Sequence, residues 1–330
     1  SVNMKIKNHP LTLRVIESLK KLKFKTSLLS TSSENEKEAK PLTQKKQVLI
    51  WLKEIIIVLI VLALIGLFIG VSYIQVVVSK APTLVASDFV EQDSTKVYDA
   101  NGNLVADIGT QIIENIHYDD LPQITIDAFV AVEDSRFFEH DGFDVPRFTK
   151  AVLENLKTFS FSQGGSTFSM QLVKGTYFET EEQLAARSGL DGVNRKIQEI
   201  ALALQAEMIV DKERILELYL NRINFGVPLN RRGIQTASKF YFGKDVSELN
   251  LVESAMLAGV INAPNAYNPI KNLDLATQRT HIVLDLMEYH GYISAEENKL
   301  AKSIKIENLI VGQLTTEVAD TNTNLTLGSN

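Results

Sequence analysis

Two adjacent carboxylates, Glu133 and Asp134, stand at the end of an apolar run in the middle of the chain. The run covers residues 128–132, so both acids are expected to be partly withdrawn from water. Desolvation raises the pKa of a carboxylate towards values that suit proton transfer. The alternative is a structural acid at a helix end, paired with Arg136. This segment alone leaves general-base catalysis and a structural ion pair equally open.

A turn rich in glycine and hydroxyl groups comes next. Gly165, Ser166 and Thr167 lead into a segment that is predicted to be helical to about residue 178. Free N–H groups at the start of a helix, together with two hydroxyls, suit a phosphate group. Lys174 lies seven residues after Thr167 and therefore on nearly the same helix face. An ordinary Ser/Thr helix cap is the alternative, and for this turn taken alone it is the commoner role.

A third group combines two cations with an acid. Arg195 and Lys196 precede Glu199 by four and three residues. On a solvated helix face, this spacing gives ion pairs that each stabilise the helix by only about 0.2–0.5 kcal/mol. The functional alternative is a basic clamp for a diphosphate beside a second acid.

The composition excludes several other kinds of site. The 330 residues are 45% hydrophobic and 22% charged, as in ordinary globular proteins. The absence of cysteine excludes disulfides, thiolate metal sites and cysteine nucleophiles. None of the five histidines belongs to an H-E-x-x-H motif, so a zinc site is not expected and no metal ligand is assigned.

The charge distribution indicates two environments separated by a membrane. Residues 1–54 hold 12 Lys+Arg and 5 Asp+Glu, whereas the remainder holds 22 and 35. Residues 55–79 carry no charge, and as a helix they would extend about 37 Å, enough to cross a ~30 Å hydrocarbon core. Lys45, Lys46 and Lys53 precede this span. A single pass through the cytoplasmic membrane is predicted, with the N-terminus inside and everything after the span extracytoplasmic.

The rest of the chain is predicted to be mainly α-helical, with one small β element. Asn101-Gly102 between two alternating apolar stretches predicts a β-hairpin that links the anchor to the main domain. Further along, apolar residues recur at helical spacing. Helix starts are expected at Asn194, Asp211, Ser247 and Ser294, and one helix end at Gly291.

Five segments follow from these patterns. They are a basic, disordered cytoplasmic tail (1–47), a transmembrane anchor (48–79), an extracytoplasmic linker with the hairpin (80–119), a helical catalytic domain (120–308) and a disordered tail (309–330).

The order and spacing of the motifs resemble those of the peptidoglycan glycosyltransferases of family 51. This family includes monofunctional transglycosylases and the glycan-polymerising module of class A penicillin-binding proteins, and the resemblance runs from about residue 95 to 300. The motif E-D-x-x-F-x-x-H-x-G is matched by Glu133, Asp134, Phe137, His140 and Gly142. The motif G-G-S-T-x-x-Q-Q-x-x-K is matched by Gly164, Gly165, Ser166, Thr167, Gln171 and Lys174.

Three further motifs follow in the family's order. The R-K-x-x-E motif and the A-x-x-x-E-like spacing after it are matched by Arg195, Lys196, Glu199, Ala203 and Glu207. The fourth resembles residues 215–221 with Phe225-Gly226, and the fifth resembles residues 232–235 and 241–244 with Ala258-Gly259 and Pro264. The chain departs from the family at Met170, usually Gln, at Gly175, commonly Asn, and in a longer link over residues 179–194. None of these changes removes an acid or a cation, so activity is still expected.

The resemblance implies a mainly α, lysozyme-like glycosyltransferase domain and assigns roles within it. Glu133 is expected to be the general base, and Glu199 to assist at the leaving diphosphate or to organise its cations. Lys174, Arg195 and Lys196 are expected to neutralise the diphosphate. The other substrate-binding residues are expected to be Asp134, Phe137, His140, Gly165, Ser166, Thr167 and Gln171.

The implied substrates are lipid II and the nascent glycan strand, and the implied surroundings are membrane lipid. Proteins of cell-wall synthesis or division are candidate partners, and nucleic acid is not. No cofactor is required, although a divalent cation, Mg²⁺ or Mn²⁺, is compatible with the diphosphate.

Three alternatives stay open at this stage. One is a lytic, lysozyme-like enzyme, because two acids also suit glycoside cleavage. Another is a catalytically silent membrane scaffold of the wall machinery, suggested by Met170. A third is the front part of a bifunctional penicillin-binding protein, although no transpeptidase motif series follows residue 300.

Overall fold

The fold is described here from a computed structural model of the chain. It describes residues 43–89, 95–99, 101, 104–108, 112–158, 164–178, 189–228 and 231–311. The chain divides into two units, the first ending at Val71 and the second beginning at Ser72. Most of the two predicted tails, residues 1–42 and 312–330, lies outside the described residues.

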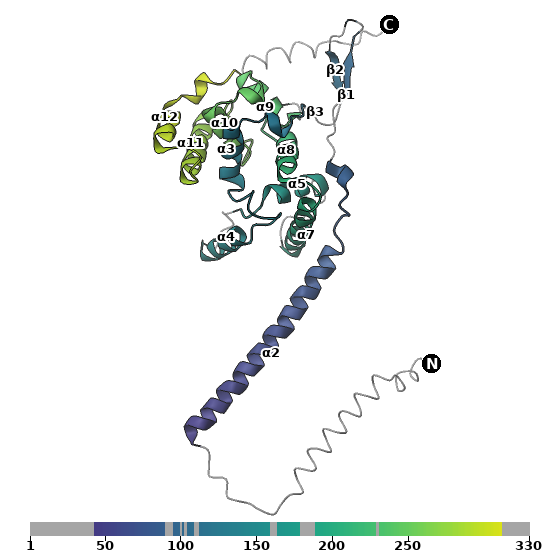
Figure 1. Ribbon diagram of the computed structural model, residues 1–330, viewed down its shortest axis with the longest axis vertical. Coiled ribbons are helices and arrows are strands. Elements are labelled where there is room, and N and C mark those ends of the chain that lie inside the picture. Colours follow the sequence, from purple (N-terminus) through teal and green to yellow (C-terminus); the bar gives the residue numbers. More distant parts are fainter. Residues whose placement is uncertain are drawn as a thin grey trace, which may run out of the picture. The chain divides into compact units, whose positions relative to one another are not determined.

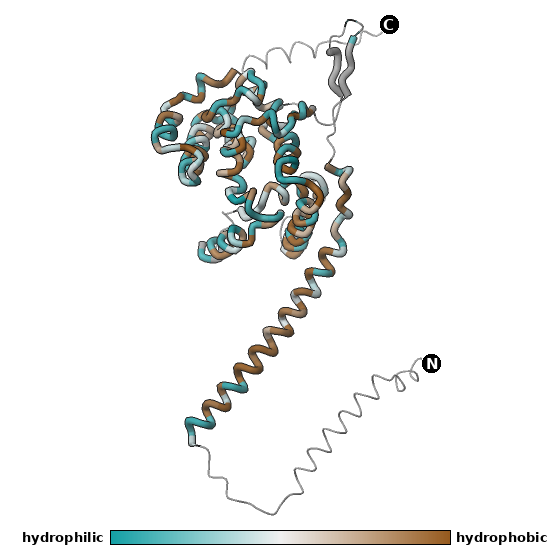
Figure 2. The backbone as a smooth tube through the Cα atoms, viewed as in Figure 1, coloured by the Kyte–Doolittle hydropathy of each residue, from teal (hydrophilic) through white to brown (hydrophobic). Residues whose placement is uncertain are grey.

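The first unit contains most of a long apolar helix, α2 (Gln44–Val78). Hydrophobic residues continue along its middle without interruption (Figure 2). Its side chains are almost all exposed, and α2 is long and apolar enough to cross a membrane. The helix begins four residues before the anchor boundary expected at residue 48.

The predicted β-hairpin is confirmed as a pair of antiparallel strands. β1 (Thr95–Tyr98) pairs with β2 (Leu104–Ile108), and the register shifts between Val97 and Tyr98. Before it, the short helix η1 (Ala86–Phe89) places Phe89 in the hydrophobic core. After it, β3 (Ile112–Ile113) lies parallel to β4 (Arg231–Arg232).

The second unit is mainly helical, which confirms the predicted fold class (Figure 1). Its α-helices are α3 (Gln123–Glu133), α4 (Val145–Thr158), α5 (Phe168–Tyr177), α7 (Gly189–Glu207), α8 (Lys212–Arg222), α9 (Ile234–Phe242), α10 (Leu251–Val260), α11 (Leu273–Tyr289) and α12 (Ala295–Ser303). Its other short 3-10 helices are η2 (Tyr118–Asp120), η3 (Val246–Glu248) and η4 (Ile306–Asn308). Helix α3 packs against α10 and α11, while α5 packs against α7 and α8.

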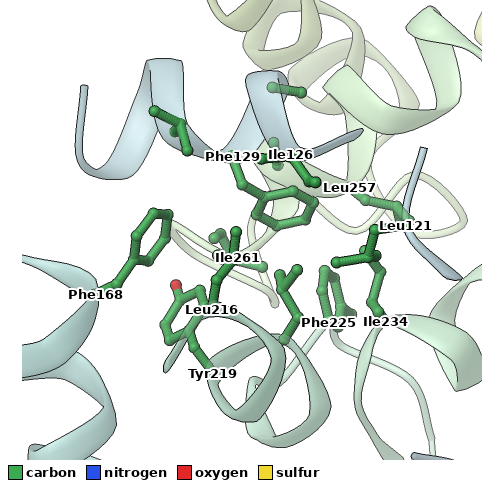
Figure 3. Packing of buried hydrophobic residues seen from close by; sticks show 14 of the residues in the cluster. Leu121, Ile126, Phe129, Phe168, Leu216, Tyr219, Phe225, Ile234, Leu257 and Ile261 are labelled. Atoms are coloured by element: carbon green, nitrogen blue, oxygen red, sulfur yellow. The ribbon is translucent and has the colours of Figure 1, made fainter. Parts of the chain in front are cut away.

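A continuous hydrophobic core joins these two groups of helices. The rings of Phe129 on α3 and Phe225, just after α8, pack edge to face with centroids 6.1 Å apart (Figure 3). Phe168 at the start of α5 packs against Tyr219 of α8, with centroids 4.8 Å apart. Burying aromatic side chains of this size removes much apolar surface from water. The core therefore fixes the end of α3 relative to α5 and α8.

Side chains from α8 hold the segment that leads into α3. The amide of Asn221 accepts from the backbone N–H of Ile116 and donates to its carbonyl, both at 3.0 Å. Glu217 accepts from the backbone N–H of Tyr118 at 2.7 Å. Without these side chains, the backbone groups of Ile116 and Tyr118 would lack hydrogen-bond partners. A backbone group that is buried without a partner destabilises the fold considerably.

Gly142, the last residue of the E-D-x-x-F-x-x-H-x-G motif, lies against the backbone of α7 at Ala203. Its φ is +86°, and an added Cβ would lie 2.6 Å from the carbonyl oxygen of Ala203. Its own carbonyl accepts a hydrogen bond of 2.7 Å from the hydroxyl of Thr167. One glycine thus brings together the loop after α3, helix α7 and the start of α5.

Several predicted helix boundaries are confirmed and two are wrong. Asp211, Ser294 and Gly291 occupy the predicted positions, and Ser294 forms the capping box with Glu297. Helix α7 begins at Gly189 rather than after Asn194, whose side chain instead accepts from the hydroxyl of Tyr73 at 2.5 Å. The cap of α10 is Asn250 rather than Ser247, because the Asn250 side chain accepts from two backbone N–H groups of the first turn.

Substituting Gly142 by alanine should destabilise the fold strongly. Strain at positive φ and the clash with Ala203 together predict a loss of about 3 kcal/mol. Gly291→Ala is the matched control, because Gly291 also has a positive φ, +79°, but no atom near its added Cβ. It should cost about 1 kcal/mol. Thermal unfolding of the detergent-solubilised chain compares them, and equal losses would contradict the packing argument.

Candidate active site

A polar pocket of about 380 Å³ brings together seven of the predicted site residues. They are Glu133, Ser166, Gln171, Lys174, Arg195, Lys196 and Glu199. Other lining residues, which the sequence analysis did not propose for the site, are Val132, Arg147, Gly164, Met170, Ile261, Asn262 and Arg279. A larger cavity of about 520 Å³ shares Gln171 but contains neither Glu133 nor Glu199. The smaller pocket is therefore the candidate active site.

Glu133 is the last residue of α3, and its half-buried carboxylate reaches the pocket. Its Oε2 accepts a hydrogen bond of 3.0 Å from the amide of Gln171. Burial raises the pKa of Glu133 above its ordinary value, whereas the Gln171 hydrogen bond and the charges of Arg147 and Arg279 oppose that rise. Arg136 pairs with Glu139 and Asp144 instead. The geometry therefore favours the catalytic interpretation of Glu133 over the ion pair with Arg136.

Asp134 is fully buried and is not among the residues that line the pocket. Its carboxylate contacts the His140 ring nitrogen at 3.0 Å and the Arg147 guanidinium at 3.4 Å. It also accepts from the backbone N–H of Phe168, the first residue of α5, at 3.0 Å. One buried carboxylate thus connects the end of α3, the loop after it, α4 and the start of α5.

Phe137 and His140 are also buried and are not among the residues that line the pocket. The Phe137 ring packs edge to face against Phe168, with centroids 5.1 Å apart, and Lys212 lies 4.5 Å above it. Their proposed substrate contacts remain predictions. In this structure His140 contacts Asp134, and Phe137 packs against Phe168 at the start of α5.

The glycine- and hydroxyl-rich turn caps α5 and contributes one hydroxyl to the lining of the pocket. Thr167 caps α5, because its hydroxyl accepts from the backbone N–H of Met170 at 3.2 Å. Ser166 faces the pocket and accepts from the ammonium of Lys196 at 2.7 Å. Gly165 lies against Phe148 of α4, where an added Cβ would come within 3.2 Å. Capping and pocket formation are thus divided between neighbouring residues.

Arg195, Lys196 and Glu199 form the expected ion pairs, but in the pocket rather than on a solvated face. Glu199 is 2% exposed, and its oxygens lie 3.2 Å from Arg195 and 3.0 Å from Lys196. A buried carboxylate between two cations orders those cations and prevents their mutual repulsion. Glu199 therefore organises the basic wall of the pocket.

Arg147 and Arg279 are pocket cations that sequence reasoning missed. Each stands alone on an amphipathic helix, α4 or α11, with no motif around it. Gly259 in the fifth motif was a weak sequence signal for Arg279. A Cβ added at Gly259 would lie 3.0 Å from Cγ of Arg279, so the glycine leaves room for this side chain. No sequence feature marked Arg147, which three-dimensional folding alone brings to Asp134.

The pocket has more positive than negative groups. Arg147, Lys174, Arg195, Lys196 and Arg279 face the two acids Glu133 and Glu199. Among the described residues, Lys174 and Arg279 form no ion pair, and the Nε of Arg279 is buried without a hydrogen-bond partner. Cations that form no ion pair within the protein are well suited to bind a multiply charged anion such as a diphosphate.

The donor set does not fit a tightly held metal ion. Within the described ranges, no three His, Asp or Glu side chains gather closely enough to hold one. Both pocket acids already interact with donors, Glu133 with Gln171 and Glu199 with Arg195 and Lys196. No step below is therefore assigned to a metal.

Comparison with known proteins gives a matching family and several relatives. Residues 101–288 match the family described as Transglycosylase. The chain is 36% identical to penicillin-binding protein 1A/1B of Bacillus subtilis, over 82% of this chain and 29% of that protein. It is 40% identical to penicillin-binding protein 1A of Streptococcus pneumoniae, over 69% of this chain and 31% of that protein. The chain thus spans about a third of the length of these curated relatives.

One solved structure is also among the matches. The crystal structure of penicillin-binding protein 1A from Haemophilus influenzae matches 64% of this chain and 21% of its own, at 24% identity and a TM-score of 0.35. At this score the superposition carries no argument, and the family assignment depends on the sequence matches.

Asp134→Asn should disturb both stability and the site. The change removes the charge that faces His140 and Arg147 and places an amide where three donors converge. We expect a loss of about 2–4 kcal/mol in unfolding free energy. Asp285→Asn is the control, because Asp285 pairs with Lys302 at the exposed surface and should cost under about 1 kcal/mol. Equal melting temperatures for the two variants would contradict the role given to Asp134.

Proposed function

Since this chain belongs to the transglycosylase family of peptidoglycan glycosyltransferases, we propose that it polymerises lipid II into glycan strands at the outer face of the cytoplasmic membrane. The observation that carries this proposal is the pairing of a desolvated carboxylate, Glu133, with an excess of cations in one pocket. A base can remove a proton at one end of the reacting centre, while cations hold the leaving group at the other.

The proposed reaction is an inverting glycosyl transfer. Glu133 takes the proton from the 4-hydroxyl of the acceptor GlcNAc, and that oxygen attacks C1 of the donor MurNAc at the end of the growing strand. The bond from C1 to the diphosphate oxygen breaks, and the undecaprenyl diphosphate leaves with the electron pair. The product carries the opposite configuration at C1.

The cations of the pocket stabilise the negative charge that develops in the transition state. Negative charge grows on the diphosphate as the C1–O bond breaks, and fixed positive groups stabilise it most where water is excluded. Among the described residues, Lys174 and Arg279 form no ion pair with an acid of the protein, so both can pair with the diphosphate. Lys196 and Arg195 are held in place by Glu199, so we assign Glu199 a supporting role at the diphosphate.

The membrane arrangement belongs to the same proposal. Lipid II carries a lipid tail that stays in the bilayer, and α2 is long and apolar enough to cross it. The lysines before the apolar stretch support a cytoplasmic N-terminus and an extracytoplasmic catalytic domain. A dependence on divalent cations and contacts with division proteins remain predictions. A lytic enzyme is less well supported, because glycan cleavage has no need for a basic pocket.

Glu133→Gln should abolish polymerisation. Glutamine keeps the size and polarity of the side chain but cannot accept the proton, so the rate should fall by at least about 100-fold. The assay incubates the detergent-solubilised full chain with lipid II and separates glycan polymer from substrate. Glu139→Gln is the matched control, because this exposed acid of the same segment pairs with Arg136 at the surface. Polymer formation by Glu133→Gln at the wild-type rate would exclude the proposed role.

The acid limb of the pH–rate profile should have its midpoint above the ordinary pKa of a glutamate side chain. Only ionised Glu133 can accept a proton, so the rate falls as pH drops through its raised pKa. The midpoint should therefore exceed about 4.3, the ordinary value. Arg279→Gln should move this midpoint higher still, because the Arg279 charge opposes the rise of the Glu133 pKa. A midpoint at or below the ordinary value would show that another group controls the rate.

A further inference from the structure

A chain of two hydrogen bonds links α8 to Glu133 through α5. The hydroxyl of Tyr219 donates to Oε1 of Gln171 at 3.2 Å. The Nε2 of Gln171 donates to Oε2 of Glu133 at 3.0 Å. Tyr219 is 3% exposed and is not among the residues that line the pocket of Glu133; it lines the larger cavity that shares Gln171.

Packing fixes the ring of Tyr219. It is tilted against Phe168 with centroids 4.8 Å apart (Figure 3), and Phe168 in turn packs against Phe137 at 5.1 Å. Burial, followed by the charges of Glu133 and Asp134, raises the pKa of Tyr219 well above its usual range. The hydroxyl therefore keeps its proton at working pH and remains a donor.

The hydroxyl of Tyr219 reinforces the orientation of the Gln171 side chain. A glutamine amide has an oxygen that only accepts and a nitrogen that only donates, and the two ends have nearly the same shape. A donor at Oε1 leaves Nε2 directed at Glu133, whereas the flipped amide would direct an oxygen at the carboxylate. We infer that Tyr219 is a positioning residue, which holds the Gln171 amide so that it donates to the catalytic carboxylate.

This inference depends on the proposed role of Glu133, and its consequence is a change in the ionisation of that group. The charged and titratable groups around Glu133 are Asp134 at the end of α3, Arg147 on α4, Lys174 on α5, Arg195, Lys196 and Glu199 on α7, Tyr219 on α8 and Arg279 on α11. Substituting Tyr219 by phenylalanine leaves every formal charge in this set unchanged. A shift in the pH profile would then report the amide orientation alone.

The primary test is Tyr219→Phe in the detergent-solubilised full chain with lipid II. Phenylalanine keeps the ring packed on Phe168 and removes only the hydroxyl. We expect kcat at acidic pH to fall about three- to tenfold, as for the loss of one hydrogen bond. The acid limb should move to higher pH, the loss should shrink as pH rises, and KM for lipid II should stay unchanged.

Tyr241→Phe is the matched control. Tyr241 is also fully buried, and its hydroxyl donates to the carbonyl of Phe225 at 2.8 Å, away from the candidate active site. This variant should lose stability without moving the acid limb. An equal shift in both variants would show a general effect of losing a buried hydroxyl and would overturn the inference.

A double-mutant cycle with Gln171→Met separates positioning from packing. Once the amide is gone, the hydroxyl of Tyr219 has nothing to orient, so the double variant should match Gln171→Met alone in its acid limb. Additive shifts would overturn the inference. If Tyr219→Phe fails to fold, Gln171→Met still tests it, since an unmoved acid limb in that variant would also overturn it.

The outcomes distinguish this inference from the proposed function. A wild-type chain that forms no polymer, or a Glu133→Gln variant as active as wild type, would overturn both. A wild type that polymerises lipid II, with an acid limb that Tyr219→Phe leaves in place, would overturn only the role of Tyr219.

Discussion

The buried carboxylate of Asp134 is the interaction on which the site depends. It receives the ring nitrogen of His140, the guanidinium of Arg147 and the backbone N–H of Phe168. An ionised group with no solvent exposure is tolerated only when its donors are in place. Because those donors come from separate segments, satisfying the charge also fixes where α3 ends relative to α4 and α5. Glu133 directly precedes Asp134 in the chain, so its position is fixed by the same contacts.

Two opposing effects then set the properties of Glu133. Burial favours its neutral form, whereas the Gln171 amide and the arginines favour its charged form. The same arginines belong to the cationic side of the pocket. Base strength and anion binding are therefore coupled in this protein, since a change to one cation alters both.

The sequence predicted the parts of the site that are local in the chain. Glu133, Gln171, Lys174 and Glu199 stand within motifs whose spacing is readable, and all of them line one pocket. Short-range patterns likewise predicted the hairpin and the capping box at Ser294, because both depend on a few neighbouring residues.

What the sequence could not predict depends on contacts between distant segments. Arg279 enters the pocket because α11 packs against α3, and Arg147 of α4 enters it beside the carboxylate of Asp134. A single arginine on a helix forms no sequence pattern that predicts either position. The start expected at Asn194 was wrong for a related reason, since α7 runs on from Gly189 and the Asn194 side chain bonds to Tyr73. Ser247 was displaced as a cap by Asn250, whose side chain fits the first turn of α10 better.

The position of Lys196 has a consequence for how tightly the pocket can hold an anion. A free lysine side chain samples many rotamers, and ordering it on binding costs about 1.5–2 kcal/mol. Here the ammonium is already held by Ser166 and Glu199, at 2.7 and 3.0 Å. An ammonium has three N–H groups, so one remains to meet a ligand. Its conformational entropy is lost when the chain folds, and an arriving diphosphate meets a cation that is already ordered.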